Sequence, residues 1–177
     1  EKSVDGIIID LRNNGGGSLQ EAIDLTGLSI ETGPVVQIKS SNGRIDIEKD
    51  FDKNIYYDGP LLLLNNSFTA SSSEIFSGAV QDYKRGLVVG ESTFGKGTVQ
   101  NLLGLDRFFP KSDKKFGQLK LTLAKYYRVS GGSTQKVGVT PHVEFPNIYD
   151  RSIYTENSRE NALKWDKIRE ISYDEKE

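Results

Sequence analysis

Three short, almost purely apolar runs constrain the fold of this chain more than any other feature. They are residues 4–12, 61–64 and 87–90, and each ends in a polar or glycine-rich stretch. Runs of this kind are typical of strands in a parallel sheet that is covered on both faces. Because helical patterns separate them, we expect an α/β domain with a mainly parallel central sheet flanked by helices.

Helix and hairpin signals fill the intervals between these runs. Capping boxes of the form Ser-x-x-Glu begin helices at Ser18 and Ser71, and the second helix carries an apolar stripe at helical spacing. Asn42-Gly43 predicts a hairpin turn. The other predicted elements are strands at 35–39, 44–47 and 117–129, a basic surface loop at 106–118, and a terminal helix at 161–171.

Composition excludes several classes of function. The 177 residues carry 23 Lys and Arg against 25 Asp and Glu, so no basic excess is available for nucleic-acid binding. Cys is absent, which excludes thiol catalysis, disulfides and Cys-based zinc sites. His142 is the single histidine, so we expect no His-rich metal site, and we interpret it as a plain strand-end residue. No apolar run approaches the roughly 20 residues that a membrane span needs.

Two glycine-containing segments suggest anion binding. Gly90-Glu-Ser-Thr-Phe-Gly-Lys96 resembles a phosphate-binding loop, but Gly97 follows where Ser or Thr is required. The next residues are β-prone rather than helical, so we disfavour nucleotide binding. The glycine run 15–17 lies between a predicted strand and a predicted helix. It forms either a tight turn or a set of exposed N–H groups for an anion or oxyanion, and the sequence leaves both open.

Ser71 has two interpretations. As the N-cap of a capping box, its hydroxyl would only accept the N–H of Glu74. Between a buried strand and a helix, it would also suit a nucleophile, with the N–H of Ser72 at the positive helix end to hold an oxyanion. Lys96 is the best candidate base, because flanking glycines let the backbone pack closely and exclude the water that keeps an amine charged. The alternative is a buried structural lysine paired with a carboxylate.

Ordered motifs along nearly the whole chain resemble those of the C-terminal processing peptidases, and most closely the tail-specific protease branch. The motifs are Asp10–Gly17, Ala70–Ile75, Gly90–Gln100, Gly131–Gln135 with Gly138–Pro141, and Asn161–Asp166.

The resemblance implies a crotonase-like α/β core with added antiparallel hairpins, and a serine endopeptidase with a Ser/Lys dyad that needs no metal or organic cofactor. The family's nucleophile falls on Ser71 and its general base on Lys96, which follows 25 residues later. The glutamine that orients this lysine in related enzymes falls on Gln100, and residues 96, 98 and 100 would share one face of a strand. The resemblance places the oxyanion hole at the N–H groups of Ser72 and Gly17. Gly16 lies beside it.

Three further positions follow from the same resemblance. Asp82 matches an aspartate linked to activity in this family. Eleven residues of helix rise about 16 Å, however, so Asp82 cannot touch Ser71 if the helix is straight. We therefore expect Asp82 to brace the helix end or a neighbouring strand. The family often has alanine where this chain has Ser72, and because serine keeps the N–H, we expect the difference to be harmless. Glu74 is interpreted first as the capping-box partner and second as a supporting residue of the site.

The resemblance also implies protein or peptide substrates with exposed C-termini, an upstream PDZ domain in the full-length protein, and a periplasmic or cell-envelope location. We interpret residues 1–177 as one catalytic-domain fragment that lacks the PDZ domain. Two alternatives stay open. One is a non-catalytic binding or scaffolding module on the same fold. The other is an acyl-thioester enzyme of the wider crotonase-like class, although no basic residue near the glycine run is placed for a coenzyme phosphate.

Overall fold

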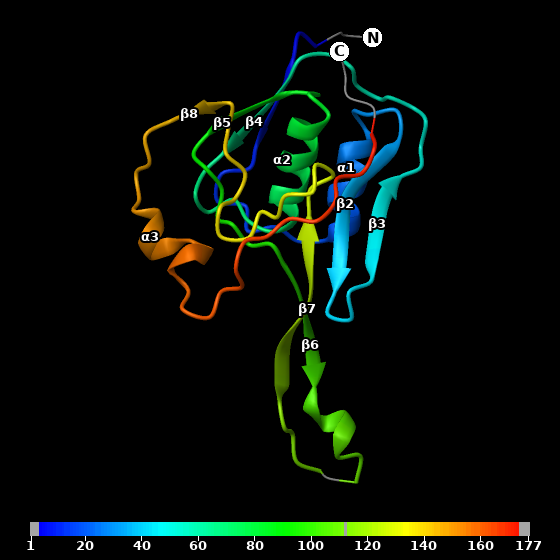
Figure 1. The fold of residues 1–177 in the computed structure, drawn as a ribbon, viewed down its shortest axis with the longest axis vertical. Coiled ribbons are helices and arrows are strands. Elements are labelled where there is room, and N and C mark those ends of the chain that lie inside the picture. Colours follow the sequence, from blue (N-terminus) through cyan, green and yellow to red (C-terminus); the bar gives the residue numbers. More distant parts are fainter. Residues whose placement is uncertain (1–3, 112, 174–177) are drawn as a thin grey trace.

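Two four-stranded sheets enclose a central helix in the computed structural model, which describes residues 4–111 and 113–173 (Figure 1). One sheet is parallel and the other antiparallel, so the mixed α/β architecture expected from the sequence is confirmed. The antiparallel strands form a complete second sheet rather than additions to the first. None of the helices in the described ranges combines the length and apolar character that crossing a bilayer requires.

The three apolar runs supply three of the four strands of the parallel sheet. Its strands, in the order β1-β4-β5-β8, are β1 Ile7–Asp10, β4 Leu61–Asn65, β5 Leu87–Gly90 and β8 Val143–Glu144. The expectation that the first run is buried on both faces is wrong. β1 lies at the sheet edge, and Ile8 is 68% exposed. The glycine run 15–17, Ser71 and Lys96 all lie in loops that follow the carboxyl ends of β1, β4 and β5.

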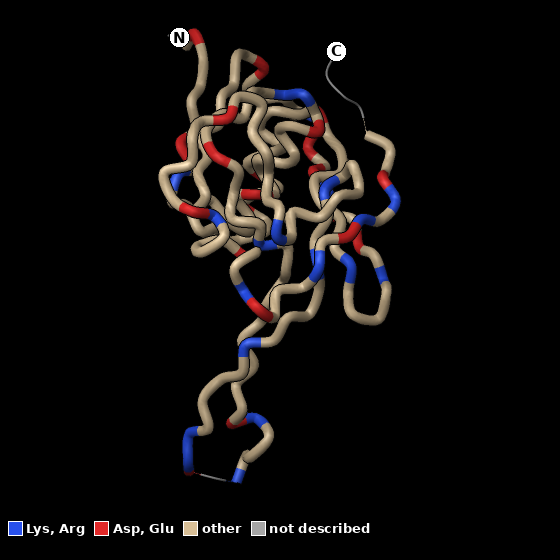
Figure 2. Tube along the Cα trace, turned by 60° about the vertical axis from the view of Figure 1, so that its left-hand side comes forward, with Lys and Arg blue, Asp and Glu red and all other residues tan. Residues whose placement is uncertain are grey.

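The antiparallel sheet has the order β3-β2-β7-β6. Its strands are β2 Gly33–Ser40, β3 Ile45–Asp50, β6 Thr98–Gly104 and β7 Gln118–Tyr127. β2 and β3 form the hairpin predicted from Asn42-Gly43. β6 and β7 continue beyond the body as a long arm with a 3-10 helix, Leu105–Phe108, near its tip (Figure 1). Figure 2 shows Lys and Arg residues along this arm, which includes the predicted basic loop; its residue 112 lies outside the described residues.

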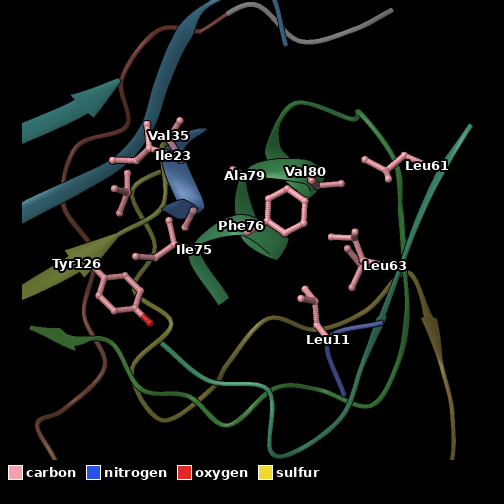
Figure 3. Close-up of a cluster of buried hydrophobic side chains, with 13 residues drawn as sticks. Leu11, Ile23, Val35, Leu61, Leu63, Ile75, Phe76, Ala79, Val80 and Tyr126 are labelled. Atoms are coloured by element: carbon pink, nitrogen blue, oxygen red, sulfur yellow. The ribbon is translucent and has the colours of Figure 1, made fainter. Parts of the chain in front are cut away.

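The two main helices lie where the capping boxes predict them, as α1 Leu19–Gly27 and α2 Ser72–Asp82. α2 is the centre of the core and is buried on nearly every side, because a sheet lies against each of its faces. In Figure 3, Phe76 and Val80 of α2 face Leu63 of β4, while Ile75 lies on the side of α1 and β2. Packing on both sides holds the N-terminus of α2 in a defined position, which is where the predicted nucleophile lies.

The predicted terminal helix at 161–171 is wrong. This segment runs extended along residues 129–133: the N–H groups of Ile168 and Ile171 donate to the carbonyl oxygens of Gly131 and Val129, at 2.9 and 3.0 Å. These bonds use N–H groups that a helix would need for itself. The helical turns near the C-terminus are instead α3, Arg151–Tyr154, and a 3-10 turn, Glu156–Ser158.

Candidate active site

Ser71 lies on the turn between β4 and α2, as the sequence predicts. Its backbone has φ 61° and ψ −122°, a conformation that non-glycine residues rarely adopt. Such strain persists only where the surroundings hold the residue in place, and it occurs most often at functional sites. Here the preceding residue is held, because the N–H of Ala70 donates to the carbonyl oxygen of Asn14 at 2.9 Å.

The carboxylate of Glu74 joins the turn of Ser71 to the segment of Lys96. One of its oxygens accepts the N–H of Ser71 at 2.8 Å and the N–H of Lys96 at 2.9 Å. The other accepts the N–H of Gly95 at 2.8 Å and the hydroxyl of Thr93. The capping-box prediction included only the Ser71 contact. Because these N–H groups are occupied, the segment before β6 does not form the phosphate-binding loop that its glycines suggest.

Glu74 is fully buried. Burial raises the pKa of its carboxyl from 4.5 to about 7, although the four hydrogen bonds that it accepts act in the opposite direction. Burial of the charged carboxylate therefore costs free energy, and the four hydrogen bonds that it accepts offset part of this cost. A proton on this carboxyl would remove one of the acceptors that position Ser71 and Lys96.

The hydroxyl of Tyr126 makes a second link between the same two residues. It bonds to the carbonyl oxygen of Lys96 and lies 3.1 Å from the carbonyl oxygen of Ser71. Burial, followed by the nearby charge of Glu74, raises the pKa of Tyr126 well above its ordinary value, so the phenol stays protonated and can donate. This role of Tyr126 is not among the sequence predictions. A tyrosine at an inward position of a strand is the available signal, since a buried phenol needs a hydrogen-bond partner.

One pocket of about 180 Å³ brings the predicted dyad together. Its lining includes Ser71, Lys96 and Gln100, together with Tyr126. Lys96 is half-buried and precedes β6 rather than lying on it. The ladder between β6 and β7 shifts its register between Val99 and Gln100, so the simple alternation expected for 96, 98 and 100 does not apply. The side-chain amide of Gln100 donates to the hydroxyl of Thr122 at 3.3 Å, on the neighbouring strand β7.

The glycine run contacts the start of α2. Gly16 has φ +89°, and a Cβ atom there would lie 2.8 Å from the Cβ of Ser71 and 2.9 Å from the nitrogen of Ser72. Only glycine allows so close an approach. The N–H of Gly17 donates to the hydroxyl of Ser72 at 2.6 Å, and the N–H of Gly16 donates to the side chain of Asn14 at 3.0 Å. The three predicted oxyanion residues therefore lie together, while their role stays a prediction.

A second pocket of about 210 Å³ lies on the other side of this contact. Gly17 and Ser72 line both pockets. The additional lining of the second pocket is largely apolar and includes Leu11, Leu25 and Phe76.

Asp82 lies at the other end of α2 from Ser71 and does not line either pocket. Its carboxylate accepts two hydrogen bonds from Arg128, at 2.6 and 3.0 Å, and one from the hydroxyl of Ser130 at 3.0 Å. This arrangement ties the end of the central helix to the segment after β7, in line with the bracing role that we expected from helix geometry.

His142 does not line the pocket that contains Ser71 and Lys96. His142 is exposed beside β5, where its Nδ1 accepts the N–H of Val88 at 3.0 Å. Among the residues that the structure describes, no group of His, Asp and Glu side chains has the arrangement of a metal site.

Comparison with known proteins identifies the family. The model of Peptidase family S41 matches residues 1–145. A tail-specific protease of Haemophilus influenzae is 46% identical over 172 residues, which are 97% of this chain and 25% of that protein. Carboxyl-terminal-processing peptidase 2 from the chloroplast of Arabidopsis thaliana is 38% identical over 150 residues, covering 84% of this chain and 28% of that protein.

A solved structure agrees with these sequence matches. The photosystem II D1 C-terminal processing protease superposes with a TM-score of 0.70 and 33% identity, over 88% of this chain and 38% of that one. The chain thus spans about a quarter to two fifths of the relatives named here. Since the family model covers most of the chain and a curated relative is 46% identical to it, this chain belongs to peptidase family S41.

Proposed function

We propose that the protein is a serine endopeptidase that cleaves other proteins at or near their C-terminal tails through an acyl-enzyme. One observation carries the proposal: Ser71, Lys96 and Gln100 line a single pocket, although they come from separate turns and strands. Glu74 accepts the N–H groups of Ser71 and Lys96, and the hydroxyl of Tyr126 lies between their carbonyl oxygens and bonds to that of Lys96. This geometry supports the assembly of a nucleophile and a base, since both backbones are held from two sides.

The proposed reaction follows from these positions. The uncharged amine of Lys96 takes the proton of the Ser71 hydroxyl while its Oγ forms a bond to the carbonyl carbon of a peptide. The N–H groups of Ser72 and Gly17 stabilise the resulting oxyanion, and the positive end of α2 adds to this effect. The Lys96 ammonium then returns the proton to the leaving amine as the C–N bond breaks. Water attacks the acyl-enzyme by the same route and releases the new C-terminus.

The surroundings of Lys96 are consistent with a base. Its side chain is half-buried, and within the described ranges no carboxylate forms a salt bridge with it. A charged structural lysine would instead be expected to pair with a carboxylate. The Glu74 carboxylate is occupied by N–H and hydroxyl donors, among them the backbone N–H of Lys96 itself. A peptide lying in the pocket would exclude further water from the site.

The proposal extends to substrates, partners and location. The names of the relatives, a tail-specific protease and two C-terminal processing peptidases, support protein tails as substrates. An upstream PDZ domain that recognises apolar C-termini and a location in the periplasm or cell envelope belong to the same proposal. The mechanism requires no metal or organic cofactor, because the chain itself supplies the nucleophile, the base and the oxyanion donors.

Substitution of the dyad in the intact protein tests the proposal. We expect Ser71→Ala and Lys96→Arg each to slow cleavage of a fluorogenic peptide with an apolar C-terminus by at least about a thousandfold. The arginine variant keeps the positive charge but cannot act as a base. Ser41→Ala and Lys53→Ala, at exposed positions, are the matched controls and should cleave normally. If either dyad variant retains the wild-type rate, the assignment is wrong and a binding or scaffolding module becomes the better interpretation.

A further inference from the structure

One of the two proposed oxyanion donors already has an acceptor. The N–H of Gly17 donates to Oγ of Ser72 across 2.6 Å, which joins segments 55 residues apart. An N–H group has one proton, so it cannot donate fully to a hydroxyl oxygen and to an oxyanion at the same time. Donors of an oxyanion hole lie about 2.7–3.1 Å from the charged oxygen. A substrate oxygen bonded to Gly17 would therefore compete with Oγ of Ser72 for the same place.

The neighbouring N–H groups do not replace this donor. The N–H of Gly16 is directed to the side chain of Asn14 at 3.0 Å. Ser72 is the first residue of α2, and its own N–H therefore has no acceptor inside the helix. In the structure, the Ser72 N–H is available to a substrate oxygen in the predicted oxyanion hole. The Gly17 N–H is not, because it donates to the hydroxyl of Ser72.

We infer that the hydroxyl of Ser72 blocks the oxyanion hole of the resting enzyme and must leave Gly17 before Ser71 can be acylated. The inference rests on the proposed function. It also revises the expectation that serine at this position is harmless, since the hydroxyl takes up a donor that catalysis requires.

The surroundings of Ser72 allow this movement. Its side chain changes between staggered positions by rotation about a single bond. Ser72 lines both the pocket of the dyad and the second pocket, so open volume adjoins this residue. Ser72 is only 8% exposed, so the hydroxyl exchanges its Gly17 partner for bulk water less readily than a surface serine would.

The blocked hole makes catalysis depend on how well the substrate binds. A peptide carbonyl must displace the Ser72 hydroxyl, and binding energy from the rest of the peptide supplies the free energy for this step. A peptide that is held at several positions reaches the open hole more easily than a short one. The Ser72 hydroxyl therefore favours substrates that fill the binding site over peptides that contact it briefly.

The test compares Ser72→Ala with Ser77→Ala in the intact protein. Ser77 lies on the same helix, is fully buried and contacts Asn65 rather than the glycine run. We expect Ser72→Ala to raise kcat/KM for a fluorogenic peptide roughly fivefold, the factor that corresponds to one competing neutral hydrogen bond. Ser77→Ala should leave kcat/KM unchanged, and Ser72→Thr, which keeps a hydroxyl, should show no gain. A peptide boronic acid that bonds to Ser71 should bind Ser72→Ala more tightly by the same factor.

A second measurement needs no variant. In wild-type protein labelled with 15N-glycine, the Gly17 amide proton should shift when the peptide boronic acid binds, because its acceptor changes from the Ser72 hydroxyl to an oxygen on boron. An unchanged Gly17 resonance overturns the inference, as does a Ser72→Ala rate equal to or below that of wild type. Ser71→Ala distinguishes failure of the proposed function from failure of this inference. If Ser71→Ala still cleaves the peptide, the proposed function is wrong. If Ser71→Ala is inactive and Ser72→Ala shows no gain in rate, only the inference about Ser72 is wrong.

Discussion

The buried carboxylate of Glu74 allows a quantitative prediction about the pH dependence of stability. Its pKa in the folded chain is raised from 4.5 to about 7, mainly by burial. The folded state therefore binds more protons than the unfolded state between these two values. The free energy of unfolding of the wild type accordingly contains a contribution that is fully present below pH 4.5 and is lost as the pH rises to about 7.

The magnitude follows from the difference between the two pKa values. The gap between about 7 and the ordinary 4.5 corresponds to about 3 kcal/mol of unfolding free energy. In Glu74→Gln the side chain cannot ionise, so the unfolding free energy of this variant lacks the pH-dependent contribution of Glu74. The amide must also face some of the four donors that now reach the carboxylate, which lowers stability by an amount that is independent of pH.

Urea unfolding followed by circular dichroism between pH 4.5 and 7.5 measures both effects. We expect the unfolding free energy of Glu74→Gln to rise relative to wild type by about 3 kcal/mol across this range. Glu31→Gln, at an exposed position between α1 and β2, is the control and should follow the wild type at every pH. If the Glu74→Gln and wild-type curves are parallel, Glu74 does not titrate in this window and our account of its burial is wrong.

Three other substitutions test how the site is held. Tyr126→Phe removes the hydroxyl that lies between the carbonyl oxygens of Ser71 and Lys96, and we expect kcat to fall about tenfold with little change in KM, as steady-state kinetics can measure. Gly16→Ala places a Cβ atom 2.6 Å from a backbone oxygen at φ +89°, so covalent labelling of Ser71, the proposed nucleophile, by a fluorophosphonate should be much slower; Gly15→Ala, which meets no atom within 4 Å, should be labelled normally. Asp82→Asn leaves Arg128 without its carboxylate, and urea unfolding should show a loss of about 2 kcal/mol. If Asp82 acts only through the fold, any loss of peptidase activity should shrink at lower temperature.

Local patterns determined most of the secondary structure. Apolar runs located β4 and β5, and two Ser-x-x-Glu boxes marked the starts of α1 and α2. These signals could be predicted because strand and helix periodicity and helix capping depend on residues within a few positions of each other. The prediction of a terminal helix was wrong because long-range contacts decide the structure of that segment. Residues 161–171 have helical spacing, but their backbone groups find better partners in residues 129–133, which no local pattern reveals.

Ordered motifs also located the residues of the candidate site, including Ser71 and Lys96, and the pocket that the structure shows contains both. What only the tertiary structure decided is how these residues are held. Glu74 looked like a helix cap, yet it also binds the segment of Lys96, and Tyr126 looked like an ordinary strand residue, yet its hydroxyl lies between the carbonyl oxygens of Ser71 and Lys96.

The contact between Ser72 and Gly17 shows the same division. The sequence determined that a hydroxyl is present beside the nucleophile, but its effect depends on a glycine loop 55 residues away that packs against the start of α2. A hydrogen bond between distant segments exists only when the fold brings the donor and acceptor atoms to within about 3 Å, and this placement results from the packing of both sheets around one helix. The sequence therefore determines the residue types and the local elements, whereas the folded tertiary structure determines the hydrogen-bond partner of each polar group.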